Sequence, residues 1–197
     1  MSRPALQIAF LSAQADRRSC ALSPVQRRFL HRLAHACGAT AVEWNFPYDA
    51  TTPPWRPLPL WRESLNVARQ FLAARRATFA SRHREAVLRL LAGAEATVFL
   101  AGSCGLELLR RLDLPPAAFT SFRYVAFGAV ARGRMPAPGL IVLGRRDWIA
   151  RGRGPAPDAW VDCGHLDYLE NAEFAARCAA FVRARHQANR LEHAAAL

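Results

Sequence analysis

Residues 97–109 read T-V-F-L-A-G-S-C-G-L-E-L-L, and this stretch decides the fold of the 197-residue chain. It begins as a short apolar run, passes through small residues around Ser103, and continues as an amphipathic segment. This order is typical of a buried strand that turns abruptly into a helix and leaves one side chain at the bend. Small residues two positions before and two after it, here Ala101 and Gly105, permit such a strained turn. We therefore expect Ser103 to stand at a strand–helix turn.

Segments on both sides of this turn alternate between strand-like and helix-like patterns. Short apolar runs predict six strands, over residues 6–12, 39–46, 97–100, 122–130, 140–143 and 160–162. Helical patterns occupy residues 23–38, 61–91 with a break in the middle, 105–112 and 171–185. Such alternation predicts a single α/β domain with a mostly parallel sheet and helices on both faces. We expect its core over residues 5–185, with 186–197 as a fraying tail.

Two of the later strands are followed by side chains that can activate a serine. Asp147 comes after the strand at 140–143, and His165 comes after the strand at 160–162. A serine hydroxyl is inert at neutral pH until a base takes its proton, and an imidazole oriented by a carboxylate performs this task. We therefore interpret Ser103 as a nucleophile, His165 as its base and Asp147 as the orienting acid. The alternatives are a helix-capping serine, a surface histidine and a surface aspartate paired with a neighbouring arginine.

The order serine, acid, histidine, with the last two each just past a strand, resembles that of the α/β-hydrolases. The resemblance covers the chain from Leu6 to about Arg185. It implies a three-layer α/β-hydrolase-like fold that lacks the leading antiparallel hairpin. It also implies no lid domain, because little sequence separates the strands at 122–130 and 140–143. Whether the proline-rich segment 48–60 folds over the site stays open.

The same resemblance implies an oxyanion site formed by two backbone N–H groups. One belongs to the residue after the serine, Cys104, and the other to the loop after the first strand, at Ala13 or Gln14. The thiol of Cys104 is an alternative nucleophile. We disfavour it because the bulky Leu106 would then occupy the small position two residues after the nucleophile.

Other charged side chains lie close to these positions. Asp162 and Asp167 are nearer to the histidine in sequence than Asp147, but Asp162 is expected within the last strand and Asp167 in the following turn. Asp147 is therefore the preferred acid. Arg145 and Arg146 precede it directly and are candidates to bind a phosphate or carboxylate of the substrate.

Arginines supply all of the positive charge, because the 27 basic residues include no lysine and the formal net charge is +12. This composition is typical of a GC-rich bacterial genome, and the arginines are dispersed without the aromatic residues that accompany nucleic-acid binding. We expect no nucleic-acid partner. Two series recur every seven residues within 61–91: Arg62, Arg69 and Arg76, and Arg75, Arg82 and Arg89. They are interpreted as a solvated helix face, the alternative being a docking stripe for an acidic acyl carrier protein.

The cysteines and the apolar runs bear on the compartment. Five cysteines without C-x-x-C spacing disfavour a disulfide framework or a zinc site. No apolar run approaches the roughly 20 residues that span a bilayer. The N-terminus weakly resembles a signal peptide, but its apolar stretch of about seven residues also supplies the first strand, which we favour. We therefore expect a cytoplasmic protein.

Together these patterns predict a serine hydrolase that cleaves a small-molecule ester or thioester through an acyl-enzyme. The chemistry requires neither a metal ion nor an organic cofactor. An acyltransferase with the same triad and a non-catalytic binding protein of the same fold are the alternatives.

Overall fold

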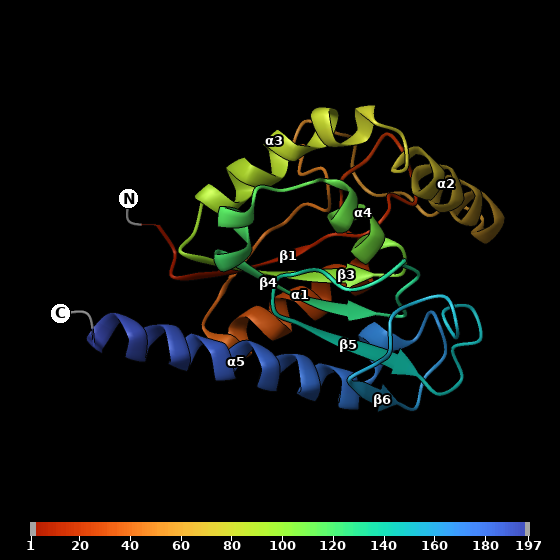
Figure 1. Cartoon of the computed structure of the whole chain (residues 1–197). Coiled ribbons are helices and arrows are strands. Elements are labelled where there is room, and N and C mark those ends of the chain that lie inside the picture. The colour runs from red at the N-terminus through yellow and green to blue at the C-terminus, as the bar shows by residue number, and fades with distance from the viewer. Residues whose placement is uncertain (1–2, 196–197) are drawn as a thin grey trace.

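The computed structural model describes residues 3–195, with side chains up to residue 184. Its centre is a six-stranded sheet in which all strands run parallel, in the order β2-β1-β3-β4-β5-β6 (Figure 1). The strands are β1 (Leu6–Phe10), β2 (Thr40–Ala41), β3 (Ala96–Gly102), β4 (Phe122–Phe127), β5 (Gly139–Gly144) and β6 (Ala159–Val161). The six predicted strands are therefore confirmed, and the sheet is parallel throughout.

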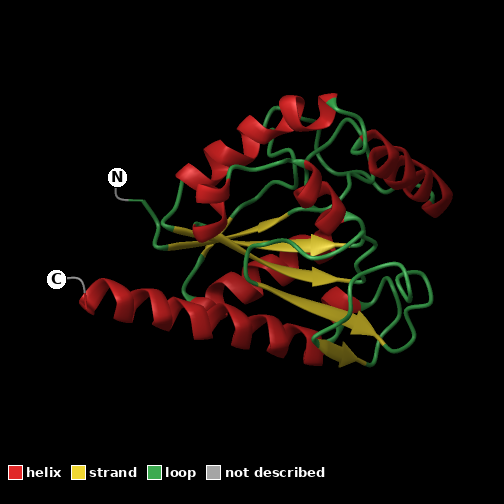
Figure 2. Ribbon diagram, viewed as in Figure 1, coloured by secondary structure: helices red, strands yellow, loops and turns green. Residues whose placement is uncertain are grey.

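Helices cover both faces of this sheet. The α-helices are α1 (Pro24–Cys37), α2 (Leu60–Ala73), α3 (Thr78–Ala92), α4 (Gly105–Arg111) and α5 (Ala172–Ala195), and two short 3-10 helices are η1 (Pro116–Thr120) and η2 (Tyr168–Glu170). Helices α1 and α5 lie against one face, and α3 and α4 lie against the other (Figures 1 and 2). This confirms an α/β fold with three layers.

The side chains of β3 show how both faces are buried. Val98 and Leu100 belong to the apolar cluster shared with α1 and α5, whereas Phe99 and Ala101 belong to the cluster shared with α3 and α4. Successive side chains of a strand point to opposite faces, so a central strand covered on both sides is apolar along its whole length. The one polar side chain within β3, Thr97, is buried and accepts a hydrogen bond from Gln7 Nε2 at 3.0 Å, and Ser103 follows at the carboxyl end of the strand.

Helix α1 begins and ends where its sequence predicts. Ser23 and Gln26 form a reciprocal capping box, and Pro24 occupies the first turn. Gly38 ends the helix in the left-handed conformation, with φ of 62°. These signals stabilise the two ends of a helix whose apolar side packs under the sheet.

Several element bounds differ from the predicted ones. The strand predicted at 39–46 pairs with β1 only over Thr40–Ala41, because the chain then leaves the sheet and Asn45 hydrogen-bonds to the loop after β1. The strand predicted at 122–130 ends at Phe127, because Gly128 turns the chain with φ of 53°. The last helix continues to Ala195, beyond its predicted end near Arg185.

The strand order determines where the loops at the carboxyl edge of the sheet diverge. Strands β1 and β3 are adjacent, and their other neighbours, β2 and β4, lie on opposite sides of this pair. Loops that follow two such strands diverge, and ligands bind in the crevice between them at the carboxyl ends. Here these loops carry Ser12–Ala13 after β1 and Ser103 after β3.

Helix α2 is an addition between β2 and α3. It lies beyond the carboxyl ends of the strands (Figure 1). Two hydrogen bonds of 2.7 Å join it to the loop after β1, from Gln14 N to Gln70 Oε1 and from Asn66 Nδ2 to Ala15 O. The connection from β4 to β5, by contrast, contains no helix. Among the helices within residues 3–195, none is long and apolar enough to cross a membrane.

Candidate active site

Ser103 stands at the predicted bend between β3 and α4. Its φ is 51°, a left-handed conformation that is uncommon for a residue with a side chain. Two backbone hydrogen bonds of 3.0 Å hold it there, from Ser103 N to Phe127 O and from Val130 N to Ser103 O. A Cβ added at Gly105 would lie 2.0 Å from the carbonyl oxygen of Leu11. Only glycine therefore permits this close approach of α4 to the end of β1.

The three side chains proposed from the sequence meet at the carboxyl edge of the sheet. His165 Nε2 lies 3.3 Å from Ser103 Oγ. On the other side of the ring, His165 Nδ1 lies 2.9 Å from Asp147 Oδ2 and 3.0 Å from Asp147 Oδ1. When Nδ1–H donates a hydrogen bond to this carboxylate, the ring presents Nε2 as an acceptor for the serine hydroxyl. The imidazole is thus oriented to take a proton from Ser103.

Asp147 is completely buried, and donors surround its carboxylate. Oδ1 accepts from Ala150 N at 2.9 Å, and Oδ2 accepts from the Tyr168 hydroxyl at 2.8 Å, in addition to the bonds from His165. Burial by itself raises the pKa of Asp147, but the hydrogen bonds from Ala150, His165 and Tyr168 outweigh it and lower the pKa below its usual value. Asp147 is therefore held as a carboxylate.

Tyr168 is a member of this arrangement that the sequence prediction missed. Its hydroxyl donates to Asp147 and accepts from Gly144 N at 2.7 Å. Its ring is buried against Phe127 and Phe174. Burial, followed by the hydrogen bond to Asp147, raises the pKa of Tyr168 far above its usual value, which keeps the phenol a donor. The only signal in the sequence was its place three residues after the histidine.

Gly128 closes the arrangement from the side of β4. A Cβ at this position would lie 2.9 Å from Asp147 Oδ2 and 3.2 Å from His165 Nδ1. Its φ of 53° also disfavours any residue with a side chain. The glycine thus leaves room for the contact between the acid and the histidine.

The two alternative acids have other partners. The Asp162 carboxylate accepts from Arg146 Nε at 3.0 Å and is exposed just beyond the end of β6. The Asp167 carboxylate accepts from Gly164 N at 3.0 Å, which stabilises the turn that carries His165. Asp147 is the acid that contacts the imidazole.

Cys104 has the properties of a core residue. Its thiol is buried, and burial raises the pKa of Cys104 to about 12, despite hydrogen bonds from the backbone of Ala13 and from its own amide that lower it. A protonated, enclosed thiol is a poor nucleophile. The interpretation of Ser103, and not Cys104, as the nucleophile is consistent with this burial.

The loop after β1 is held by Asn45, a second residue that the prediction missed. Asn45 Oδ1 accepts from Ser12 N at 3.0 Å, and its Nδ2 donates to Ser12 O at the same distance. The backbone N–H of Gln14 donates to Gln70 Oε1, and the backbone N–H of Ala13 faces the Cys104 thiol, so both predicted oxyanion donors of this loop have a partner within the protein. Segment 48–60 lies beside the loop, where Ser19 Oγ donates to Pro53 O at 2.6 Å and Cys20 N donates to Thr52 Oγ1 at 2.8 Å.

The arginines predicted to bind substrate are exposed at the carboxyl end of β5. Arg146 is paired with Asp162, while the backbone oxygen of Arg145 accepts a hydrogen bond from the Arg151 guanidinium. Arg145 is thus an exposed residue two positions before Asp147, whereas Arg146 stabilises the contact between the loops after β5 and β6.

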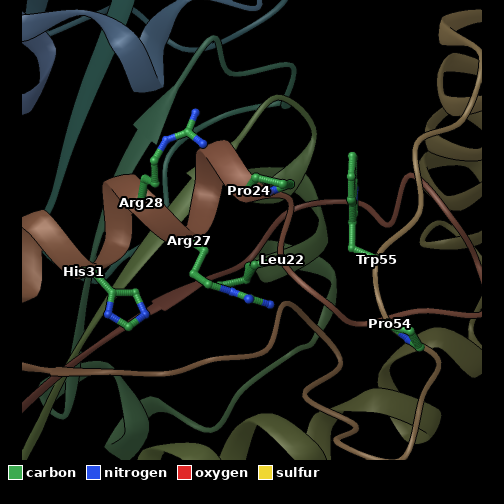
Figure 3. A pocket seen from close by; sticks show the side chains of 7 residues that line it. All are labelled: Leu22, Pro24, Arg27, Arg28, His31, Pro54 and Trp55. Atoms are coloured by element: carbon green, nitrogen blue, oxygen red, sulfur yellow. The ribbon is translucent and has the colours of Figure 1, made fainter.

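A separate hollow of about 550 Å³ lies over the first turns of α1 (Figure 3). Its lining combines apolar residues with two arginines and a histidine, and Arg27 reaches from α1 toward Trp55 while Arg28 points away. His31, on the same helix, pairs with Glu43 at 2.9 Å. This hollow contains no residue of the triad. Among the described residues, no group of three or more His, Cys, Asp and Glu side chains is arranged to hold a metal ion.

Comparison with known proteins assigns the chain to no family: no protein-family model matches it, and no curated protein matches it.

Proposed function

We propose that the protein is a serine hydrolase of the α/β-hydrolase type that cleaves an ester or a thioester. The observation that carries the proposal is the position of His165, whose two ring nitrogens face Ser103 Oγ and the buried carboxylate of Asp147. The strained backbone at Ser103 supports it, because unusual φ angles of residues with side chains concentrate at functional sites.

In the proposed reaction, Ser103 Oγ attacks the acyl carbon while His165 Nε2 takes the hydroxyl proton. Asp147 stabilises the imidazolium that forms, and Tyr168 keeps the carboxylate in place. The backbone N–H of Cys104 and that of Ala13 or Gln14 stabilise the oxyanion, the latter in exchange for its contact with the Cys104 thiol or with Gln70. His165 then returns the proton to the leaving alcohol or thiol.

Water completes the reaction by attacking the acyl-enzyme, with His165 again acting as the base. An alcohol or amine in place of water would give an acyl transfer by the same residues. We prefer hydrolysis because the imidazole is not sealed from solvent, its side chain being 13 % exposed.

A fluorophosphonate probe tests the proposal, because it labels only a serine whose hydroxyl is activated by a neighbouring base. We expect wild type to be labelled, Ser103→Ala to lose the label, and His165→Ala to be labelled at least about a hundredfold more slowly. Cys104→Ala is the matched control and should still be labelled. Absence of labelling in folded wild type, or labelling that persists in Ser103→Ala, would refute the proposal and favour a binding protein.

A panel of soluble acyl esters and thioesters then defines the reaction. Turnover by wild type that disappears in Ser103→Ala supports hydrolysis, and product formed only when an acceptor alcohol or amine is added supports transfer. The acyl chain with the highest kcat/KM identifies the substrate class.

A further inference from the structure

Large exposed apolar side chains gather around the carboxyl edge of the sheet. Trp148 follows Asp147 directly and is 76 % exposed, and Leu166 follows His165 and is 70 % exposed. Helix α2 carries four more on the same side of the molecule (Figure 1): Leu60, Trp61, Leu65 and Leu72. Single exposed apolar residues are ordinary, whereas a concentration around a candidate site indicates an interaction surface.

The apolar residues of α2 form a stripe. Trp61, Leu65, Ala68 and Leu72 follow a spacing of four, three and four residues, which places them on one side of a helix. All four are exposed, Trp61 by 63 %. The opposite side of α2 holds the helix in place, because Val67 and Phe71 pack against the core and Gln70 binds the loop after β1. The stripe therefore points away from the protein.

Arginines flank this stripe. Helical geometry places Arg62 and Arg69 along one side of it, and Arg75 and Arg76 follow in the turn after α2; all four are exposed. The Arg62 guanidinium lies 5.0 Å from the Trp61 ring. Within α2 the one acidic residue is Glu63. The stripe thus combines large apolar side chains with positive charge, on a protein whose net charge is +12.

We propose that the α2 stripe, together with Trp148 and Leu166, docks the protein on an anionic lipid surface. A helix with a tryptophan- and leucine-bearing side bordered by arginines lies in the headgroup region of a bilayer, and its arginines attract anionic lipids. Long arginine side chains reach the headgroups while the apolar side chains enter the acyl boundary. The stripe projects from a convex helix, a shape that suits a soft lipid surface better than the groove-and-helix contacts of peptide recognition.

Docking in this orientation turns the carboxyl edge of the sheet toward the lipid. Trp148 and Leu166 follow Asp147 and His165 directly in the chain, so the sheet edge that carries Ser103 would face the membrane. This step rests on the proposed function: it assigns to the hydrolase an amphiphilic ester or thioester whose acyl chain partitions into lipid.

Sedimentation with vesicles tests the docking without any need for activity. We expect the protein to bind vesicles of equal parts phosphatidylcholine and phosphatidylglycerol, to bind pure phosphatidylcholine vesicles weakly, and to dissociate as salt screens the arginines. The combined variant Trp61→Gln, Leu65→Gln and Leu72→Gln should bind at least about tenfold more weakly. These side chains do not pack in the core, so its thermal unfolding should match wild type.

A charge-matched pair isolates the role of α2. Arg62→Gln with Arg69→Gln should weaken binding to the anionic vesicles, whereas Arg82→Gln with Arg89→Gln on α3 changes the net charge equally and should have little effect. Equal losses from the two pairs would indicate attraction by overall charge and would overturn the proposal. Failure of wild type to bind anionic vesicles would do the same.

A fluorescent label reports which face meets the lipid. The five native cysteines are buried, so an environment-sensitive dye can be attached selectively at Leu72→Cys or, as a control, at Arg82→Cys. Anionic vesicles should shift the emission of the dye at position 72 to the blue and leave the control unchanged. A response at position 72 to an acidic acyl carrier protein, with none to vesicles, would make the stripe a protein-docking site and overturn the proposal.

The docking and the proposed function can fail separately. Ser103→Ala should bind vesicles as wild type does, and the α2 variants should label with fluorophosphonate as wild type does. Vesicle binding without labelling would refute the proposed hydrolase activity, and labelling without vesicle binding would refute the proposed docking.

Discussion

Removing the hydroxyl of Tyr168 tests whether Asp147 is held as the structure shows. Tyr168→Phe leaves the buried ring in place and deletes only the oxygen that donates to Asp147 and accepts from Gly144 N. Asp147 then loses a donor to its charge, and Gly144 keeps an N–H without its partner. A hydrogen bond to a charged group contributes about 1.5–3 kcal/mol, and an unsatisfied buried donor costs about 1–3 kcal/mol. We expect Tyr168→Phe to lower the free energy of unfolding by about 3–5 kcal/mol.

Tyr124→Phe is the matched control. Tyr124 is equally buried, and its hydroxyl accepts from Met135 N at 3.3 Å but contacts no carboxylate. Its loss should cost about 1–2 kcal/mol. For a chain of this length each kcal/mol lowers Tm by about 2–4 °C, so thermal unfolding followed by circular dichroism separates the two variants clearly.

The pH dependence of the difference gives a second test. The lowered pKa of Asp147 stabilises the folded state above the unfolded pKa, about 3.9 for aspartate, and this stabilisation is lost as the pH falls through the folded pKa. Deleting the Tyr168 donor raises the pKa of Asp147 toward its usual value. The difference in free energy of unfolding between Tyr168→Phe and wild type should therefore be largest at neutral pH and become smaller in acid. The loss of stability caused by Tyr124→Phe should not change with pH.

Activity provides the third readout. Tyr168 is a positioning residue, so its variant should lower kcat by about tenfold and leave KM unchanged, because no contact with substrate is removed. The reasoning would be refuted if Tyr168→Phe were no more destabilising than Tyr124→Phe and showed no additional pH dependence.

Two glycine-related predictions concern the bend at Ser103. Gly105→Ala places a Cβ 2.0 Å from the backbone oxygen of Leu11 and should lower the free energy of unfolding by more than about 3 kcal/mol. The control Gly38→Ala, at a position with positive φ but open space, should lower it by about 1 kcal/mol. Equal losses of the two variants in urea unfolding would exclude the clash. Ser103→Gly and Ser103→Ala both lack the hydroxyl, but glycine adopts the positive φ without strain. Ser103→Gly should therefore be the more stable of the two by about 1 kcal/mol in the same assay. A more stable Ser103→Ala would argue against strain at the bend.

The sequence predicted the sheet well because its strands are buried on both faces. Such strands are continuous apolar runs, as in β3, and the runs stand out between capped helices such as α1. The second strand was predicted too long, since residues 42–46 alternate apolar and polar side chains as a strand does but leave the sheet. Local pattern does not reveal where a chain departs from its neighbour, because that depends on the pairing partner.

The site was predictable to the extent that its residues follow strand ends. Ser103, Asp147 and His165 each come just after a strand, and parallel strands bring their carboxyl ends to one edge. Asn45 was missed because nothing in its neighbourhood marks it, and for Tyr168 the position three residues after His165 was too weak a signal. Their importance lies in contacts with Asp147 and Ser12, which are distant in sequence and become visible only once the sheet has assembled.

Helix α2, between β2 and α3, is separate in the chain from the segments that carry the proposed relay. The three side chains of the proposed relay all come from the carboxyl-terminal half, after β3, β5 and β6, whereas the outward stripe belongs to a segment that the sheet does not use for pairing. Grafting a different helix over residues 60–73, with the Asn66 and Gln70 contacts retained, would therefore redirect the protein to another surface while the reacting groups stayed in place. In these two proposals, the docking helix and the reacting side chains belong to separate parts of the chain.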